Sequence, residues 1–321
     1  MINHSTDISH LVVSIVIPVY NEESVLPSLI ERLNGLSANN QELRFEVLFV
    51  NDGSRDRTRK ILEQAHQTHG YGLISFSRNF GHQAAVSAGL KYARGNFIAI
   101  IDGDLQDPPE AIPGMVQLLM DASADVAYGV RQNRKEIFIK RLSYYLFYRL
   151  LLRLTPFSIP LDSGDFSVIS QRVASVINSM PEKHRFVRGL RSYAGFKQVP
   201  YYYSRNARAA GDSKYTLAKL IGLAADGIFT FSELPLKLST FLGLFISVVS
   251  FLLGFMLITW RLMSGNVLPG FATISVGLFF LGGVQLLSLG ILGEYVGRIH
   301  SEVKSRPAFV VDTYLPDENI A

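Results

Sequence analysis

The stretch AIIDGDLQDPPE, residues 99–110, decides the fold because a buried strand ends there in a group of acids. Apolar residues run directly into Asp102 and Asp104, Asp107 follows, and two prolines prevent the strand from continuing. Three carboxylates this close together repel one another, so we expect a positive partner beside them.

The spacing of Asp102 and Asp104 suits a divalent metal ion as that partner. The two carboxylates stand on either side of Gly103, which lets the backbone turn tightly. Mg²⁺ typically takes one or two carboxylates together with substrate phosphates, and Mn²⁺ accepts the same ligands. The alternative is an acidic turn that caps a helix beginning near Pro109. A cap needs only one carboxylate, so this alternative suits Asp107 better than the pair.

Strand and helix patterns alternate on both sides of this stretch. The apolar runs lack polar alternation, as is typical of strands covered on both faces, and they span 11–19, 45–51, 72–77, 96–102 and 125–130. Helical patterns lie between them, near 22–36, 56–69, 82–93 and 109–120. Repeated strand–helix units predict an α/β protein with a doubly wound, mostly parallel sheet, whose ligands bind at the carboxyl ends of the strands.

Two long apolar segments predict a membrane anchor. Residues 238–260 and 268–293 carry no charge, and each is long enough to cross a hydrocarbon core of about 30 Å. Basic residues flank the pair while the short loop between them has only Arg261, so the positive-inside rule places the N-terminal part in the cytoplasm. A pair of buried core helices is the alternative. The expected parts are a cytoplasmic domain, two transmembrane helices and a cytoplasmic tail, at 1–235, 236–295 and 296–321 respectively.

Two further segments have the composition of interfacial helices. Residues 137–154 are too charged to span a membrane, but their leucines and aromatic residues fit an amphipathic helix in the interface. A helix that covers the sheet is the alternative for this segment. Residues 217–235 are expected to form a second interfacial helix ahead of the first span.

Composition and missing motifs exclude several kinds of site. The chain has 321 residues and no cysteine, which excludes disulfides and thiolate metal sites. The motifs H-E-x-x-H, G-x-S-x-G and Walker A do not occur, which disfavours a zinc hydrolase, an α/β-hydrolase and a P-loop protein. The net charge of +4 is a weak indication of phosphate or an anionic membrane surface. We expect no nucleic-acid partner.

Polar side chains also follow the second predicted strand, in VNDGSRDRT, residues 50–58. Asp52 comes directly after the apolar run, where its carboxylate can accept a hydrogen bond from a base N–H or a ribose hydroxyl. Gly53 permits a tight turn, and Ser54 or Asp56 can cap the next helix.

Basic side chains recur in three clusters further along the chain. The cluster SRNARAAGDSKY, residues 204–215, is a plausible phosphate clamp ahead of the membrane-proximal segment. A basic strip that faces anionic lipid headgroups is the alternative. The candidate residues of the three clusters are Arg131 and Arg134, then Arg185 and Arg188, then Arg205, Arg208, Ser213 and Lys214.

Six motifs, taken in chain order, resemble the family 2 glycosyltransferases of the polyprenyl-phosphate type, such as bactoprenol glucosyltransferases and relatives of dolichyl-phosphate mannose synthase. They are SIVIPVYNEE, VNDGSRD, SRNFGHQAAVSAGL, IDGDLQDPPE, SGDFSVISQRV and GDSKY. The resemblance covers nearly the whole chain. It implies an A-type glycosyltransferase fold, a nucleotide-sugar donor, a divalent metal (Mg²⁺ or Mn²⁺) and a polyprenyl-phosphate acceptor.

The resemblance also implies roles for individual residues. Asp52 would hold the nucleotide base, and Asp102 would contact the nucleotide as well as the metal. Asp165 in SGDFSV matches the catalytic carboxylate, and Asp104 would join it in catalysis. The base pocket would include Pro18, Tyr20 and Glu22; the metal site Asp102, Asp104 and Gln106; the phosphate site Arg131, Arg205, Arg208, Ser213 and Lys214.

The resemblance implies inverting transfer of a single sugar to undecaprenyl phosphate at the cytoplasmic face of a bacterial inner membrane. The Q-x-x-R-W signature of processive synthases is missing, which favours one transfer over polymerisation. UDP-glucose is the expected donor, although one Asp can serve UDP or GDP. The alternatives are transfer to another membrane acceptor and a non-catalytic scaffold that binds nucleotide-sugar. We also expect a homo-oligomer, with a tetramer as one arrangement, in which the tail pairs with a neighbour's sheet.

Overall fold

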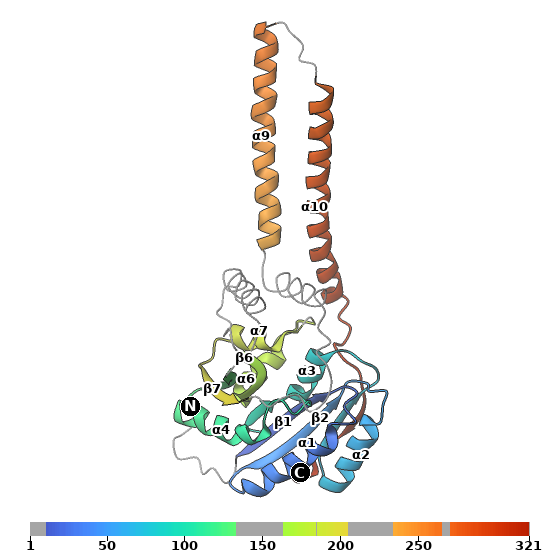
Figure 1. Ribbon diagram of the computed structural model, residues 1–321, viewed down its shortest axis with the longest axis vertical. Coiled ribbons are helices and arrows are strands. Elements are labelled where there is room, and N and C mark those ends of the chain that lie inside the picture. The colour runs from blue at the N-terminus through green and yellow to red at the C-terminus, as the bar shows by residue number, and fades with distance from the viewer. Residues whose placement is uncertain (1–10, 133–162, 184, 205–233, 265–269, 321) are drawn as a thin grey trace. The chain divides into compact units, whose positions relative to one another are not determined.

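The computed structural model describes residues 11–132, 163–183, 185–204, 234–264 and 270–320 (Figure 1). The described residues fall into two compact units. One contains every described strand and includes the C-terminal segment from Pro307 onward, and the other contains two long helices near the C-terminus.

The strands of the first unit form one mixed sheet. Its eight strands lie in the order β7-β5-β6-β4-β1-β2-β3-β8. β1 pairs in parallel with β2 and β4, as do β2 with β3 and β5 with β7, whereas β6 and β8 are antiparallel to their neighbours. The strand bounds are β1 Val12–Val19, β2 Arg44–Asn51, β3 Gly72–Phe76, β4 Phe97–Ile100, β5 Val126–Gln132, β6 Ser163–Ser170, β7 Gln198–Ser204 and β8 Val311–Leu315.

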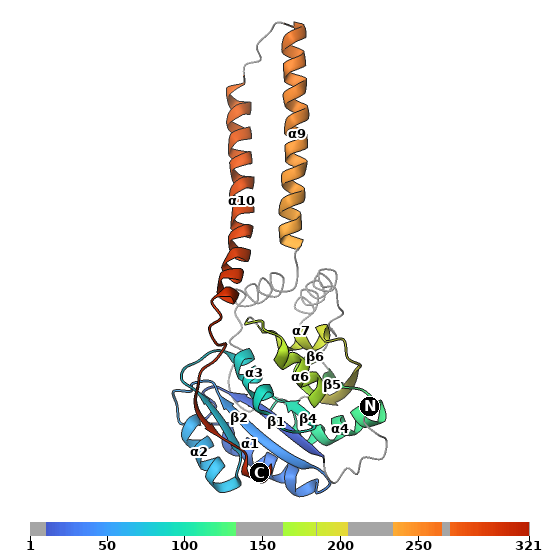
Figure 2. The same cartoon turned by 180° about the vertical axis from the view of Figure 1, so that it is seen from behind.

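Helices cover both faces of this sheet (Figures 1 and 2). Along β1, Ile15 and Ile17 belong to one buried cluster and Val16 to the other, because successive side chains of a strand point to opposite faces. The helices on the Ile15 face are α1 Leu26–Asn39, α2 Thr58–His69 and α4 Ile112–Asp121. Those on the Val16 face are α3 His82–Tyr92, α6 Gln171–Ser179 and α7 Val187–Tyr193. The predicted doubly wound, mostly parallel α/β sheet is confirmed.

The sequence patterns did not predict three strands. β6 begins with the polar residues SGDFS, β7 contains Pro200 beside three tyrosines, and β8 is only five residues long. β6 lies between β4 and β5, antiparallel to both. The start of β6 therefore lies at the edge of the sheet where β4 ends, which brings residues far apart in sequence to one place.

The C-terminal segment completes the sheet of its own chain. β8 pairs with β3, and a 3-10 turn at Glu318–Ile320 follows it. Asp317 is buried and accepts a hydrogen bond from the backbone N–H of Val47 at 2.9 Å. The tail thus pairs with a strand of its own chain, and the expected homo-oligomer stays a prediction.

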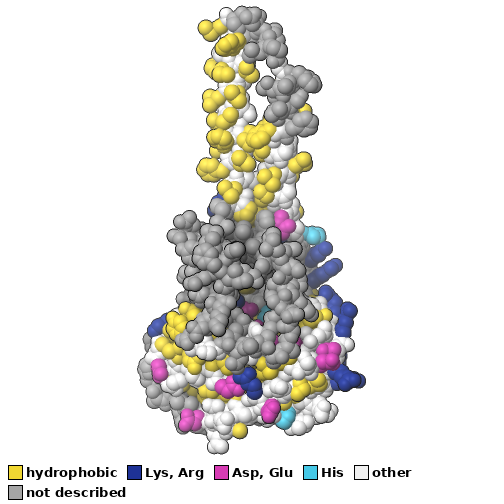
Figure 3. Space-filling view, in the orientation of Figure 1, with side chains coloured by type: hydrophobic (Ala, Val, Ile, Leu, Met, Phe, Trp, Pro, Cys, Tyr) yellow, Lys and Arg dark blue, Asp and Glu magenta, His cyan; other side chains and the backbone are white. Residues whose placement is uncertain are grey.

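The second unit contains α9 Leu234–Ser264 and α10 Phe271–Val303. Among the described helices these two are long and apolar enough to cross a membrane, over Pro235–Trp260 and Phe280–Val303. Large apolar side chains are exposed along both, as Figure 3 shows in yellow. α10 continues ten residues beyond the predicted end of the second span at Gly293. The predicted interfacial helix at 137–154 lies outside the described residues, as does the one at 217–235 except for its last two residues, which open α9.

Candidate active site

The candidate site lies at the edge of the sheet where β4 ends and β6 begins. In the β4–β6 pairing Ile100, the last residue of β4, lies opposite Ser167. Asp102 follows Ile100 by two residues and Asp165 precedes Ser167 by two, so the antiparallel pairing brings both carboxylates to the same edge of the sheet. The site thus faces two carboxylates toward each other from segments some sixty residues apart in the chain.

His82 lies between these two carboxylates. Its Nε2 is 3.7 Å from Asp102 Oδ1 and 3.7 Å from Asp165 Oδ2. The histidine is the first residue of α3 and follows Gly81, whose φ of +100° favours glycine. This glycine therefore sets the turn that brings the imidazole to the carboxyl edge of the sheet.

The carboxylates of this site have opposite electrostatic environments. Burial and the charges of Asp165, Asp107 and Asp104 raise the pKa of Asp102 to about 6, although His82 opposes the shift. Burial would also raise the pKa of Asp165, but its contacts with His82 and Arg188 outweigh burial and hold that pKa well below its usual range. Asp165 is therefore ionised at neutral pH, while Asp102 needs a further positive charge.

His82 responds to the same charges. Burial by itself would lower the pKa of the imidazole, but the contact with Asp165 and the charges of Asp102 and Asp52 outweigh burial and raise it. The shift favours the charged imidazolium, which places a positive charge between the two carboxylates when His82 is protonated.

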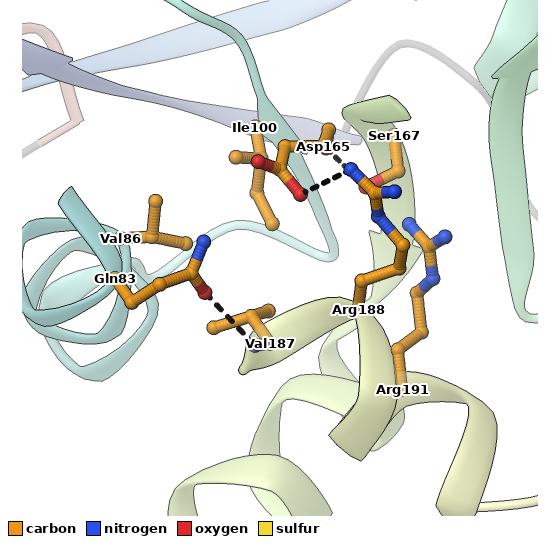
Figure 4. Close-up of a pocket in the computed structure, with 8 residues that line it drawn as sticks. All are labelled: Gln83, Val86, Ile100, Asp165, Ser167, Val187, Arg188 and Arg191. Carbon is orange, nitrogen blue, oxygen red and sulfur yellow. Dashed lines mark hydrogen bonds and ion pairs between the residues drawn. The ribbon is translucent and has the colours of Figure 1, made fainter. Parts of the chain in front are cut away.

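Two arginines of α7 lie below Asp165 at the side of a small cavity (Figure 4). Arg188 donates from Nη2 to Asp165 Oδ1 at 3.1 Å. Arg191, one helical turn further on, is almost fully buried, and burial lowers its pKa to about 10. Within the described part of the chain its Nε and Nη2 find no hydrogen-bond partner. Gln83 of α3 holds α7 in place by accepting from the backbone N–H of Val187 at 2.9 Å.

Asp52 organises the neighbouring loop after β2. It is buried, its Oδ1 accepts from the Phe80 N–H at 2.6 Å, and its Oδ2 accepts from the Gly81 N–H at 2.9 Å. Burial raises the pKa of Asp52 although these hydrogen bonds oppose the shift. Gly53 follows with a φ of +65°, and a Cβ there would lie 2.3 Å from the carbonyl carbon of Arg78. Each Asp52 oxygen keeps a second lone pair for a ligand.

The loops after β1 and β2 are joined by hydrogen bonds. Asn21 N–H donates to Ser54 Oγ at 3.0 Å, and the Asn21 side chain accepts from the Arg55 N–H at 2.8 Å. Asp56 Oδ1 accepts from the Thr58 N–H at 3.0 Å, so Asp56 supports the start of α2. Pro18, Tyr20 and Glu22 lie on the β1 side of this junction, next to the Asp52 loop.

The loop after β4 carries the predicted metal ligands. Asp104 Oδ1 accepts from the Gln106 N–H at 3.1 Å, and Gln106 is buried. Asp107 is buried and accepts from Tyr203 Oη at 2.6 Å, so it anchors β7. In the described ranges no three His, Asp or Glu side chains cluster as metal ligands. Asp102 and Asp104 fit a divalent ion as two hard oxygen donors, with substrate oxygens completing the coordination.

The predicted phosphate-binding residues are only partly described. Arg131 lies on β5, where its backbone pairs with Tyr203 of β7. The other four, Arg205, Arg208, Ser213 and Lys214, lie outside the described residues.

Of the three residues that the fold brings to Asp165, the sequence patterns had indicated Arg188, as part of a basic cluster, and had missed Arg191 and His82. Arg188 and Arg191 stand three apart in RFVRGLR and so share one face of a short helix. This pair was a usable signal. No sequence signal pointed to His82 apart from its position after a glycine, because only the β4–β6 pairing brings two carboxylates to either side of it.

Comparisons with known proteins show the family to which the chain belongs. The model of the family described as "Glycosyl transferase family 2" matches residues 14–177. The chain is 43% identical over 312 residues to the uncharacterized glycosyltransferase YkcC of Bacillus subtilis, covering 97% of this chain and 96% of that protein. It is 38% identical to the SfII prophage-derived bactoprenol glucosyl transferase of Shigella flexneri, covering 93% and 97% respectively.

A solved structure shows the same fold. Glucosyl-3-phosphoglycerate synthase from Mycobacterium tuberculosis, in complex with Mn²⁺, uridine-diphosphate-glucose and glycerol 3-phosphate, superimposes with a TM-score of 0.50 at 18% identity. The match covers 71% of this chain and 81% of that one. The sheet is thus of the A type found in glycosyltransferases, and the chain belongs to glycosyl transferase family 2.

Proposed function

We propose that the protein transfers one sugar residue, glucose, from UDP-glucose to undecaprenyl phosphate with inversion at the anomeric carbon. The observation that carries this proposal is the pair Asp102 and Asp165, which face each other with His82 between them. Family membership supports glycosyl transfer. Relatives named bactoprenol glucosyl transferase, 36–38% identical over most of the chain, support glucose and a polyprenol acceptor.

The nucleotide would bind at the junction of the β1 and β2 loops. Asp52 would accept from the base there, with Pro18, Tyr20 and Glu22 beside it. Tyr20 is 42% exposed, so its ring is available to a ligand. The glucosyl-3-phosphoglycerate synthase with UDP-glucose bound supports a uridine nucleotide in a fold of this type.

Asp102 and Asp104 would hold a divalent cation, with Gln106 nearby. The electrostatics of the site support this assignment, because burial and three neighbouring carboxylates make an ionised Asp102 unfavourable without a positive partner. When bound, the cation would neutralise charge on the leaving diphosphate. The Mn²⁺ in the glucosyl-3-phosphoglycerate synthase supports a metal of this class.

Asp165 would orient the acceptor and would not serve mainly as a proton acceptor. Its contacts with Arg188 and His82 hold its pKa well below the usual range, which makes it a weak base at neutral pH. The acceptor phosphate has a second pKa of about 6, so at neutral pH it is largely dianionic and needs no base to deprotonate it. Arg188 and Arg191 bring two positive charges to this one carboxylate, and the surplus charge suits an anionic acceptor.

Membrane attachment is part of the same proposal. α9 and α10 would cross the bacterial inner membrane, and the sheet would lie in the cytoplasm because the flanks of the helices are basic. Arg131, Arg205, Arg208, Ser213 and Lys214 would bind diphosphate or acceptor phosphate, and a homo-oligomer remains an expectation.

The test measures transfer of labelled sugar by the purified full chain in detergent. A panel of UDP- and GDP-sugars is offered with undecaprenyl phosphate, or with diacylglycerol in its place, in Mg²⁺, Mn²⁺ or EDTA. We expect a lipid-linked product when UDP-glucose and undecaprenyl phosphate are supplied with a divalent metal. We expect no product in EDTA, and none when diacylglycerol replaces undecaprenyl phosphate. Product only with diacylglycerol would overturn the acceptor. Nucleotide binding without any product would indicate a scaffold.

Asp165→Asn separates positioning from proton transfer. If Asp165 orients the acceptor, the variant stays inactive at every pH, including well above the second phosphate pKa. Recovery of turnover at high pH would instead show that Asp165 removes a residual proton.

A further inference from the structure

A chain of aromatic contacts connects the C-terminal segment to the loop that holds Asp52. Phe309 stacks on Phe76 with the ring centroids 5.1 Å apart and an interplanar angle of 11°. Phe76 in turn meets Phe80 edge-on, at 5.7 Å and 90°. The Phe80 N–H donates to Asp52 at 2.6 Å. The rings of Phe76 and Phe80 thus lie between the tail and the carboxylate of the proposed base pocket.

The backbone fixes Phe309 at the start of this chain of contacts. The N–H of Ser77, directly after β3, donates to the carbonyl of Val310 at 3.1 Å. Phe76 pairs with Val311 where β8 joins β3. Phe309 is therefore held against Phe76 by strand pairing on the residue that follows it, and its position does not depend on ring stacking alone.

Phe80 also positions a positive charge near Asp52. The guanidinium carbon of Arg78 lies 4.0 Å from the centroid of the Phe80 ring, the geometry of a cation–π contact. A displacement of Phe80 would therefore move both the N–H that holds Asp52 and a cation close to where a nucleotide would bind.

We propose that Phe309 is a positioning residue of the donor site, which acts through Phe76 and Phe80 on Asp52. The inference rests on the proposed role of Asp52 in nucleotide binding. It gives the tail a function beyond completing the sheet: the last segment of the chain sets the shape of the pocket built by the first two strands.

Tyr314 provides a matched control in the same segment. It packs on Tyr92 with centroids 4.7 Å apart, and its hydroxyl accepts from Arg94 at 3.2 Å. Tyr92 ends α3, at the opposite end of that helix from His82. Tyr314→Ala therefore removes a comparable aromatic contact of β8 and leaves the chain from Phe309 to Asp52 intact.

The experiment measures UDP and GDP binding to the full chain in detergent by calorimetry with Mn²⁺ present, alongside thermal unfolding. We expect Phe309→Ala to raise the Kd for the bound nucleotide by up to about tenfold, which is the factor reached if the whole free energy of such an aromatic contact serves to hold Asp52 in its binding position. Phe309→Leu, which keeps apolar volume, should have a smaller effect. Tyr314→Ala should lower the unfolding temperature similarly but leave the Kd within about twofold.

Hydrogen exchange of the Phe80 and Gly81 amides gives a second readout. Their protection should fall in Phe309→Ala and not in Tyr314→Ala, since both amides donate to Asp52. Unchanged binding and protection in Phe309→Ala, or equal changes in the two variants, would overturn this inference alone. If the unaltered protein bound neither nucleotide, the proposed function would fail and the inference with it.

Discussion

Arg188 and Arg191 lie one turn apart on α7. Among the residues that the structure describes, only Arg188 has a carboxylate partner, so replacing each by methionine should have opposite effects. Methionine keeps much of the apolar length of arginine and removes the charge. Arg188→Met breaks the 3.1 Å contact with Asp165, whereas Arg191→Met removes a buried charge with unpartnered nitrogens in the described structure.

The exposure of the two partners sets the size of the effect. The Arg188 and Asp165 side chains are 17% and 27% exposed, so the pair is largely but not wholly desolvated. Breaking a fully buried pair costs ~3–5 kcal/mol, and we expect the lower end, about 3 kcal/mol, for Arg188→Met. Arg191→Met should leave stability unchanged or raise it by about 1 kcal/mol, because burying an unpaired charge is unfavourable.

The pH dependence follows from the depressed pKa of Asp165. A carboxylate with a lowered pKa in the folded state stabilises the protein above its ordinary pKa, and this contribution is lost as the pH falls through the folded value. Without Arg188 the pKa rises toward its ordinary value. The stability difference between Arg188→Met and the unaltered protein should therefore be full at pH 7 and should shrink below about pH 4.

Thermal unfolding followed by circular dichroism from pH 3 to 8, together with glucosyl transfer at pH 7, measures both effects. We expect kcat of Arg188→Met to fall about 10- to 100-fold, from the loss of a charge-assisted hydrogen bond at Asp165. Arg191→Met should instead raise KM for the lipid phosphate. Two results would refute the reasoning. One is equal destabilisation by the two substitutions, and the other is a stability difference between Arg188→Met and the unaltered protein that does not change with pH.

Three further substitutions test other parts of the site. His82→Gln should lower kcat about 10- to 100-fold in the transfer assay, because it removes the positive charge between two carboxylates; near-normal turnover would contradict this. Gly53→Ala should destabilise the fold by about 1–3 kcal/mol in thermal unfolding, since φ is +65° and a Cβ would meet Arg78, whereas Gly35→Ala, with open space around its Cβ position, should not. Tyr203→Phe should cost about 1–3 kcal/mol by leaving buried Asp107 without this hydrogen bond, and an unchanged unfolding temperature would count against that.

Local patterns were sufficient for the parallel half of the sheet. β1 to β4 are mostly apolar and almost wholly buried, and a segment buried on both faces can be recognised as a strand without knowing which strands it pairs with. The acids that follow these strands could be assigned to one edge for the same reason, because parallel strands end together. Asp52, Asp102 and Asp104 were therefore predictable as neighbours.

β6, β7 and β8 were not predictable in this way. β7 and β8 are edge strands with mixed exposure. β6 begins with polar residues because its first residues, which include Asp165, belong to the site. Nothing local in SGDFSVIS distinguishes it from a loop. Its insertion between β4 and β5 depends on long-range hydrogen bonds that form only when the whole sheet is assembled.

The sequence by itself determined the α/β class, the acidic edge, the two long apolar helices and the glycosyltransferase motifs, because each of these depends on composition or on spacing within one segment. Only the tertiary structure decided what surrounds Asp165. The antiparallel pairing of β6 with β4 brings it to the edge of the sheet where Asp102 lies, α3 brings His82 between them, and α7 supplies Arg188. The physical reason is that charges interact through space, so the pKa of Asp165 is set by residues that the chain order keeps apart.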